Sequence, residues 1–206
     1  MGRNSGGVVH TGGGGANAAI VVQAVQNSRS ISTIKDRSVV KELQRGISRF
    51  ESVLGIRERD VRIADLDKMN ALGVTWIGPQ GESAGILLNE KFFDRKKKSI
   101  ESDVRSKHYD TGFKNKTNAP LQHTITHELA HATWNASMKT AKAQGAKKEI
   151  TKLYQKWLKD KKKKGYGTYG ASNVSEFYAE GITKAIHGNA DRYTRKLVAI
   201  TKKYGL

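Results

Sequence analysis

The sequence predicts an α+β fold in which a small mixed sheet packs on one central helix and further helices follow. Three observations support this class: an amphipathic repeat in residues 40–54, short apolar segments between residues 61 and 88, and long helical patterns in the second half. With 206 residues, 37% of them hydrophobic, the chain can bury one ordinary core. We expect one domain over residues 34–206, preceded by a flexible arm rich in Gly, Ser and Asn over residues 1–33.

The first long helix is predicted from the spacing of its apolar residues. They recur at intervals of three and four, which places them on one face of a helix that Gly55 ends. A shorter helix could form over residues 18–26, inside the arm. The apolar face of the long helix consists of Val40, Leu43, Ile47, Phe50 and Leu54.

Three short apolar segments then predict strands at residues 61–63, 74–77 and 84–88, with a turn at residues 78–81. A strand left at the edge of a sheet can pair with an extended peptide, so the last segment is a candidate for binding a substrate. The same segment could equally be an ordinary core strand. This candidate edge consists of Gly85, Ile86, Leu87 and Leu88.

Helices account for most of the remaining chain. Phe92 and Phe93 should begin a helix that runs to Ile100, and Pro120 suits the first position of a helix that runs to Met138. The later helices are expected at residues 140–164, ended by Gly165, at residues 173–187, and from Asp191 onward.

The helix that begins at Pro120 contains the motif H-E-x-x-H. His127 and His131 are one turn apart on the same face, so both imidazoles can reach one metal ion at about 2.0–2.1 Å. Glu128 lies beside that face, where it can hold and deprotonate a metal-bound water, as in zinc peptidases. The alternative is a helix whose two histidines are surface residues or hydrogen-bonded core residues.

A catalytic zinc site needs a third protein ligand. A metzincin would have a His six residues after His131 with a Gly before it, but those positions are Ser137 and Trp134, which excludes that class. Glu176 and Glu180 are one turn apart on a later helix. One of them could bind the ion while the other accepts the N–H of a ligating imidazole. Acidic residues near a helix N-terminus also occur simply because they complement the helix dipole.

The second half of the chain resembles the catalytic domain of anthrax lethal factor and its relatives in bacterial toxins and in phage or prophage proteins. The resemblance rests on H-E-x-x-H, a Tyr-Gly pair, and E-F-Y-A-E about forty-five residues further on. It implies a zincin-like metallopeptidase of the gluzincin type, with a C-terminal helical subdomain. It also implies a Zn²⁺ site formed by His127, His131 and Glu176.

The same resemblance implies roles for three more residues. Glu128 would be the general base, and Glu180 would hold His127. Tyr169, seven residues before Glu176, would stabilise the oxyanion that forms during peptide hydrolysis. Tyr166 is also followed by Gly, but the spacing favours Tyr169.

Charge and composition bound the other possibilities. The net charge is +18, of which residues 91–164 carry +13. The basic runs at residues 95–98 and 161–164 could bind nucleic acid or another acidic surface nonspecifically, although solvated helix ends are the simpler interpretation. The chain has no cysteine, which excludes a Cys-based zinc site, and neither a secretory signal nor a membrane span is recognisable.

The sequence therefore predicts a zinc-dependent endopeptidase with a protein or peptide substrate. The resemblance suggests a phage, prophage or toxin context, in the cytoplasm of a bacterial host or attached to a virion. The alternative from another class is a basic virion-associated or nucleic-acid-binding protein in which the zincin-like site is structural or inactive.

Overall fold

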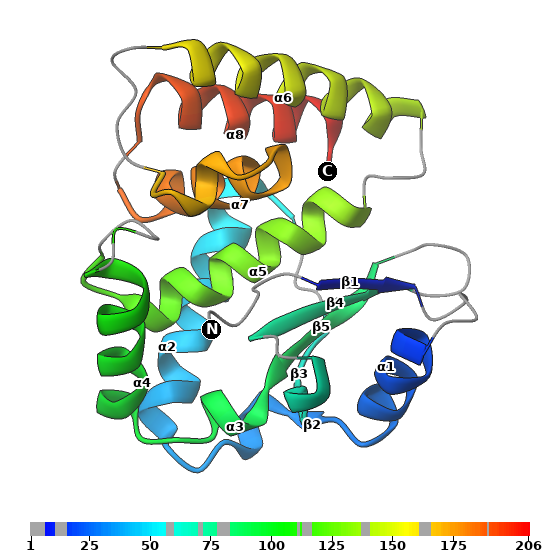
Figure 1. The fold of residues 1–206 in the computed structure, drawn as a ribbon, viewed down its shortest axis with the longest axis vertical. Helices are drawn as coiled ribbons and strands as arrows, with labels where there is room; N and C mark the ends of the chain where they lie inside the picture. The colour runs from blue at the N-terminus through cyan, green and yellow to red at the C-terminus, as the bar shows by residue number, and fades with distance from the viewer. Residues whose placement is uncertain are drawn as a thin grey trace.

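A computed structural model describes residues 7–10, 16–56, 60–69, 72–77, 83–110, 112, 117–136, 141–160, 166–188 and 190–206. The fold is α+β, as the sequence predicts, with a small mixed sheet beside a mostly helical body (Figure 1). Helix α5 runs between the two parts, since it packs on β4 and β5 on one side and on α7 on the other. Its position explains why residues from both parts of the chain meet on it.

Within the described residues, the sheet has five strands in the order β1-β4-β5-β3-β2. Strand β3 runs parallel to β5, whereas β4 is antiparallel to β5 and β2 is antiparallel to β3. Strand β1 is parallel to β4. The strands are β1 (Gly7–His10), β2 (Arg29–Ser30), β3 (Val61–Ala64), β4 (Gly73–Ile77) and β5 (Ser83–Asn89).

The prediction that Gly85, Ile86, Leu87 and Leu88 form an exposed sheet edge is wrong. They belong to β5, the middle strand, which pairs with β3 on one side and β4 on the other. The side chains of Ile86, Leu87 and Leu88 are fully buried. The ordinary core strand, which the sequence left equally open, is therefore what forms.

Regular structure is present within residues 7–10 and 16–33, where the sequence predicts an arm. The expected short helix is present as α1 (Ala16–Gln26), and β1, β2 and the 3₁₀ turn η1 (Ile31–Thr33) are additional. The segment is anchored because Val21 of α1 is fully buried in a small apolar cluster with Trp76 and Leu87 of the sheet. Pairing of β1 with β4 is a long-range contact that local sequence does not reveal.

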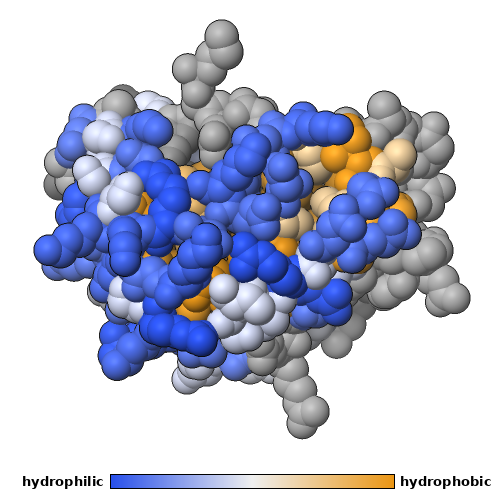
Figure 2. Space-filling model, turned by 90° about the horizontal axis from the view of Figure 1, so that it is seen from below, coloured by the Kyte–Doolittle hydropathy of each residue, from blue (hydrophilic) through white to orange (hydrophobic). Residues whose placement is uncertain are grey.

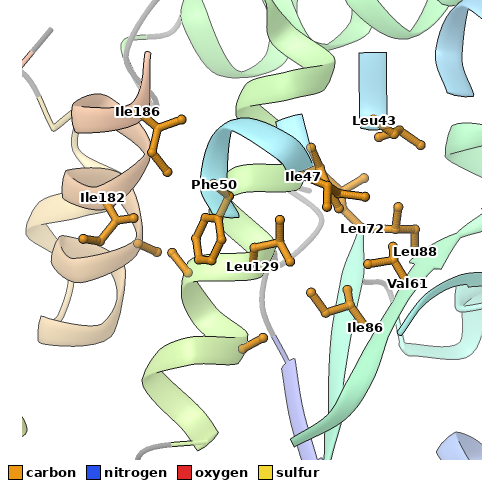
Figure 3. Close-up of a cluster of buried hydrophobic side chains, with 14 of the residues drawn as sticks. Leu43, Ile47, Phe50, Val61, Leu72, Ile86, Leu88, Leu129, Ile182 and Ile186 are labelled. Carbon is orange, nitrogen blue, oxygen red and sulfur yellow. The ribbon is translucent and has the colours of Figure 1, made fainter. Parts of the chain in front are cut away.

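The helix predicted from the apolar repeat is α2 (Arg37–Leu54), and Gly55 ends it in the left-handed conformation with φ 71°. Its apolar face packs on α5, where Phe50 and Ile47 lie close to Leu129 (Figure 3). On the far side of Leu129, Ile86 and Leu88 of the sheet complete the same core (Figure 3). A single hydrophobic core thus holds α5 in place.

The remaining helices follow the predicted order. One difference is that the helix expected from Phe92 to Ile100 is divided in two at Asp94, which ends the first of them. The helices are α3 (Glu90–Phe93), α4 (Lys97–Val104), α5 (Pro120–Ala136), α6 (Ala141–Lys159), α7 (Val174–Ile186) and α8 (Arg192–Tyr204), with shorter turns η2 (Asp67–Met69), η3 (Arg105–Tyr109) and η4 (Tyr169–Ala171).

The surface is predominantly hydrophilic on the face seen from below (Figure 2). Hydrophobic residues show there as patches between hydrophilic ones, the broadest toward the upper right (Figure 2). Among the described residues, no helix combines the length and the apolar character that crossing a membrane requires.

Candidate metal centre

Helix α5 presents the two motif histidines to the interior. It begins at Pro120, whose fixed φ and missing N–H suit the first helical position. His127 is fully buried and His131 is 2% exposed, so neither is an ordinary surface histidine. Buried imidazoles need polar partners, and the partners here come from α7.

Three ligand atoms converge at the junction of α5 and α7. The Nε2 atoms of His127 and His131 are 3.1 Å apart. One oxygen of Glu176, Oε2, lies 3.0 Å from Nε2 of His131 and 3.4 Å from Nε2 of His127. The three side chains form a cluster that could hold a metal ion.

The size and chemistry of this triangle fit zinc. A tetrahedral ion with bonds of about 2.0–2.1 Å separates its ligand atoms by about 3.3–3.4 Å, close to the observed edges. Two imidazole nitrogens and one carboxylate oxygen are a common donor set for Zn²⁺ that leaves a fourth position for water or substrate. The chain supplies no cysteine that would compete as a ligand.

A second layer of side chains orients both histidines. Nδ1 of His127 lies 2.9 Å from Oε1 of Glu180, which is fully buried. Nδ1 of His131 lies 3.1 Å from the hydroxyl oxygen of Ser175. With their Nδ1 atoms directed at these oxygens, both rings turn Nε2 toward Glu176, the arrangement expected for metal-binding histidines.

The start of α7 explains the position of Glu176. Asn173 caps the helix, and its side-chain oxygen accepts a hydrogen bond from the backbone N–H of Glu176. Burial raises the pKa of the Glu176 carboxyl group, but hydrogen bonds with the rings of His127 and His131 outweigh it and hold the pKa well below its usual value. The carboxylate is therefore ionised at neutral pH, the form that binds metal.

Glu128 is separate from the three converging atoms. The residue is 1% exposed, and neither carboxylate oxygen has a hydrogen-bond partner among the described residues. It lies against Gly73 of β4, where a Cβ atom would come within 2.9 Å of the Glu128 carboxylate. Any side chain larger than that of glycine at position 73 would therefore require the strand or Glu128 to shift.

The two tyrosines that the sequence gives as candidate oxyanion donors have different surroundings in the structure. The ring of Tyr169 stacks on His127, with centroids 5.9 Å apart and planes inclined by 28°. Tyr166 is instead buried in an aromatic cluster with Trp157 and Phe177, and burial raises the pKa of its phenol. Gly170 permits this arrangement, because a Cβ atom there would lie 2.8 Å from Cβ of Tyr166 and 3.3 Å from Cβ of Glu180.

His123, one turn before His127, is not part of the cluster. It is 3% exposed, and its ring faces that of His187, with centroids 5.7 Å apart. His187 also lies 3.2 Å from the hydroxyl of Thr126. His123 is therefore buried against the partly exposed ring of His187.

The sequence motifs do not identify two residues of the site, Ser175 and Gly73. Ser175 directly precedes Glu176 in the first turn of α7, which is only a weak indication that it belongs to the site. Gly73 has no such indication, because its importance arises from the approach of β4 to α5, which no local pattern encodes. Tertiary packing, rather than the motif, defines this part of the site.

One basic run forms ion pairs with acidic residues that are not members of this cluster, and the other lies outside the described residues. In the first run, Arg95 forms an ion pair with Asp103 at 2.8 Å, and Lys97 forms one with Glu42 at 3.3 Å. The run at residues 161–164 is outside the described part of the chain. Binding of nucleic acid or acidic surfaces by these runs stays a prediction.

Comparison with known proteins adds no family. No protein-family model, no curated protein and no solved structure matches this chain.

Proposed function

We propose that the protein is a zinc-dependent endopeptidase of the gluzincin type. The observation that carries the proposal is the convergence of His127, His131 and Glu176, with the buried carboxylate of Glu128 on the same helix as the two histidines. A bound zinc ion would lower the pKa of a coordinated water and polarise the carbonyl of the scissile peptide bond.

The roles of the side chains follow from their positions. Glu128, which has no partner among the described protein groups, would accept a proton from the attacking water and later return it to the leaving amine. Tyr169, stacked on His127, would donate a hydrogen bond to the developing oxyanion. Glu180 and Ser175 would keep the two imidazoles in the tautomer that presents Nε2 to the ion.

The test uses a peptide library, because the substrate sequence is unknown. Zinc-loaded protein is incubated with a tryptic digest of a bacterial proteome, and new peptide ends are identified by mass spectrometry. Wild-type protein should cleave a subset of the peptides. Glu128→Gln should reduce cleavage by about 10²–10⁴-fold, because the amide has nearly the same shape but cannot take the proton.

Zinc content is measured on the same samples. Glu128→Gln should retain the metal, because Glu128 is not one of the three converging ligands. Zinc-loaded wild-type protein that cleaves no peptide would contradict the peptidase assignment and favour a structural metal. Equal cleavage by wild type and Glu128→Gln would indicate a contaminating enzyme.

A further inference from the structure

The outer edge of β4 lies beside the candidate active site. Strands β4 and β5 both pack on α5, and Gly73 at the start of β4 abuts Glu128. The inner edge of β4 pairs with β5. A polypeptide that added to the outer edge would therefore run along β4 and, at its Gly73 end, pass close to the general base.

This outer edge is already covered by the protein's own N-terminal segment. Strand β1 pairs with β4 along four residues, from Gly7 opposite Val74 to His10 opposite Ile77. The ladder begins one residue from Gly73, at the end of β4 that approaches Glu128. In Figure 1, β1 lies at the end of the sheet, beyond β4. Strand β1 thus uses the backbone groups that an added peptide would need.

Strand β1 has fewer strand neighbours than β3, the strand that flanks β5 on its other side. Both have four residues and pair in parallel, the slightly less stable arrangement, but β3 lies between β5 and β2, whereas β1 has β4 as its one neighbouring strand in the described sheet. The sequence places Gly6 and Gly7 at its start and four consecutive glycines, residues 12–15, after it. Ordering glycine costs more conformational entropy than ordering any other residue, which favours release of such a strand.

We propose that β1 is an exchangeable occupant of the β4 edge that competes with extended peptide substrates. The proposal rests on the peptidase function proposed above. Because β1 is tethered to the sheet that it covers, its effective concentration is of the order of millimolar, so it weakens substrate binding without any change in the catalytic groups. Release of β1 opens the edge, and return of β1 closes it.

Hydrogen exchange tests whether β1 leaves independently of the rest of the sheet. In wild-type protein, amides of β4 that face β1 should exchange at least about tenfold faster than those shared by β3 and β5. The double variant Val8→Pro/Val9→Pro removes the N–H groups of two successive residues of β1, one of which faces β4, and should accelerate exchange in β4 alone. The matched control Val8→Ala/Val9→Ala keeps both donors and should behave more like wild type. Equal protection of the β1-facing amides of β4 and the amides shared by β3 and β5 in wild type would contradict an exchangeable strand.

Kinetics test whether the strand competes with substrate. The probe is the peptide that zinc-loaded protein cleaves fastest in the library experiment. The proline variant should lower KM by roughly threefold to tenfold and leave kcat unchanged, because only the population of open edge changes. An unchanged KM, or a fall in kcat, would mean that β1 does not compete or that it supports the active site.

A disulfide that fixes β1 to β4 should have the opposite effect on cleavage, because the strand can then no longer leave the edge. Val8 and Thr75 are directly paired, and neighbouring strands lie about 4.7–4.9 Å apart, within the span of a disulfide. The chain contains no cysteine, so Val8→Cys with Thr75→Cys forms a defined pair. The oxidised form should lose cleavage of the probe peptide, and a reducing agent should restore it. Full activity in the oxidised form would overturn the proposal.

The failure of this proposal can be distinguished from failure of the proposed function. If no variant cleaves any library peptide, the peptidase assignment and the competitor role both fail, whatever the exchange rates are. If the wild type cleaves peptides while the β1-facing amides of β4 are as protected from hydrogen exchange as those shared by β3 and β5, only the proposal of an exchangeable β1 is rejected.

Discussion

At the scale of single residues, the stacking of Tyr169 on His127 carries the assignment of the oxyanion donor. Tyr169→Phe should lower kcat by about 10²–10³-fold, because the hydroxyl stabilises charge that develops only in the transition state. Zinc content should not change, since Tyr169 is not among the converging ligands. Tyr166→Phe is the matched control. It removes a hydroxyl from the aromatic cluster and should leave kcat unchanged, so equal losses in both variants would contradict the assignment.

Ser175 gives a second test at this scale. Its hydroxyl lies 3.1 Å from Nδ1 of His131, so Ser175→Ala should weaken zinc binding by about 10–100-fold. The affinity is measured by competition with a chromophoric chelator. Ser106→Ala, which truncates an exposed serine bonded to the backbone oxygen of Asp103, is the control. Wild-type affinity in Ser175→Ala would show that the hydroxyl does not orient the ring.

Sequence alone identifies only part of this site. His127 with His131, and Glu176 with Glu180, are recognisable because helix periodicity places residues four apart on one face. Which glutamate approaches the imidazole Nε2 atoms depends on how α7 packs against α5, and the structure gives Glu176 that position. Gly73 comes from a strand more than fifty residues away, so no spacing rule could have indicated it.

At the scale of elements, Asp36 joins the starts of two helices. One carboxylate oxygen accepts a hydrogen bond from the backbone N–H of Ser38 in α2, and the other accepts one from the backbone N–H of Lys97 in α4. The Ser38 hydroxyl and these backbone bonds lower the pKa of Asp36 from 3.8 to about 2. Because the folded-state pKa is the lower one, the stabilisation is present above pH 3.8 and is lost as the pH falls through about 2.

This arrangement predicts a pH-dependent loss of stability. Asp36→Ala should lower the melting temperature at neutral pH, and the difference from wild type should shrink as the pH falls from about 4 toward 2. Asp36→Asn keeps an acceptor without the charge, so its difference from wild type should be smaller at neutral pH. Thermal unfolding followed by circular dichroism measures both. A difference that stays constant with pH would contradict the role of the ionised carboxylate.

Most elements could be predicted, but their arrangement could not. The helices are visible because apolar residues recur with helical spacing and because Pro120, Gly55 and Asp191 mark their ends. The order of strands is set by pairing between distant segments, which is why β5 was expected at an edge and lies in the middle. The same reason explains why pairing of β1 with β4 was not expected.

At the scale of the whole molecule, the candidate metal site connects two parts of the fold. His127 and His131 belong to α5, which packs on the sheet, whereas Glu176 belongs to α7 in the helical part. An ion bound by all three would link these parts and stabilise the folded state through its own binding free energy. The central claim is therefore that this chain binds zinc at the junction of α5 and α7.

Zinc stoichiometry tests that claim most directly, because it requires no knowledge of the substrate. Metal content is measured by inductively coupled plasma mass spectrometry after zinc loading and removal of excess ion, for wild type, Glu176→Ala and the control Glu51→Ala. We predict about one zinc per chain in wild type and in the control, and loss of the ion in Glu176→Ala. Wild-type protein without zinc, or undiminished zinc in Glu176→Ala, would contradict the site described here.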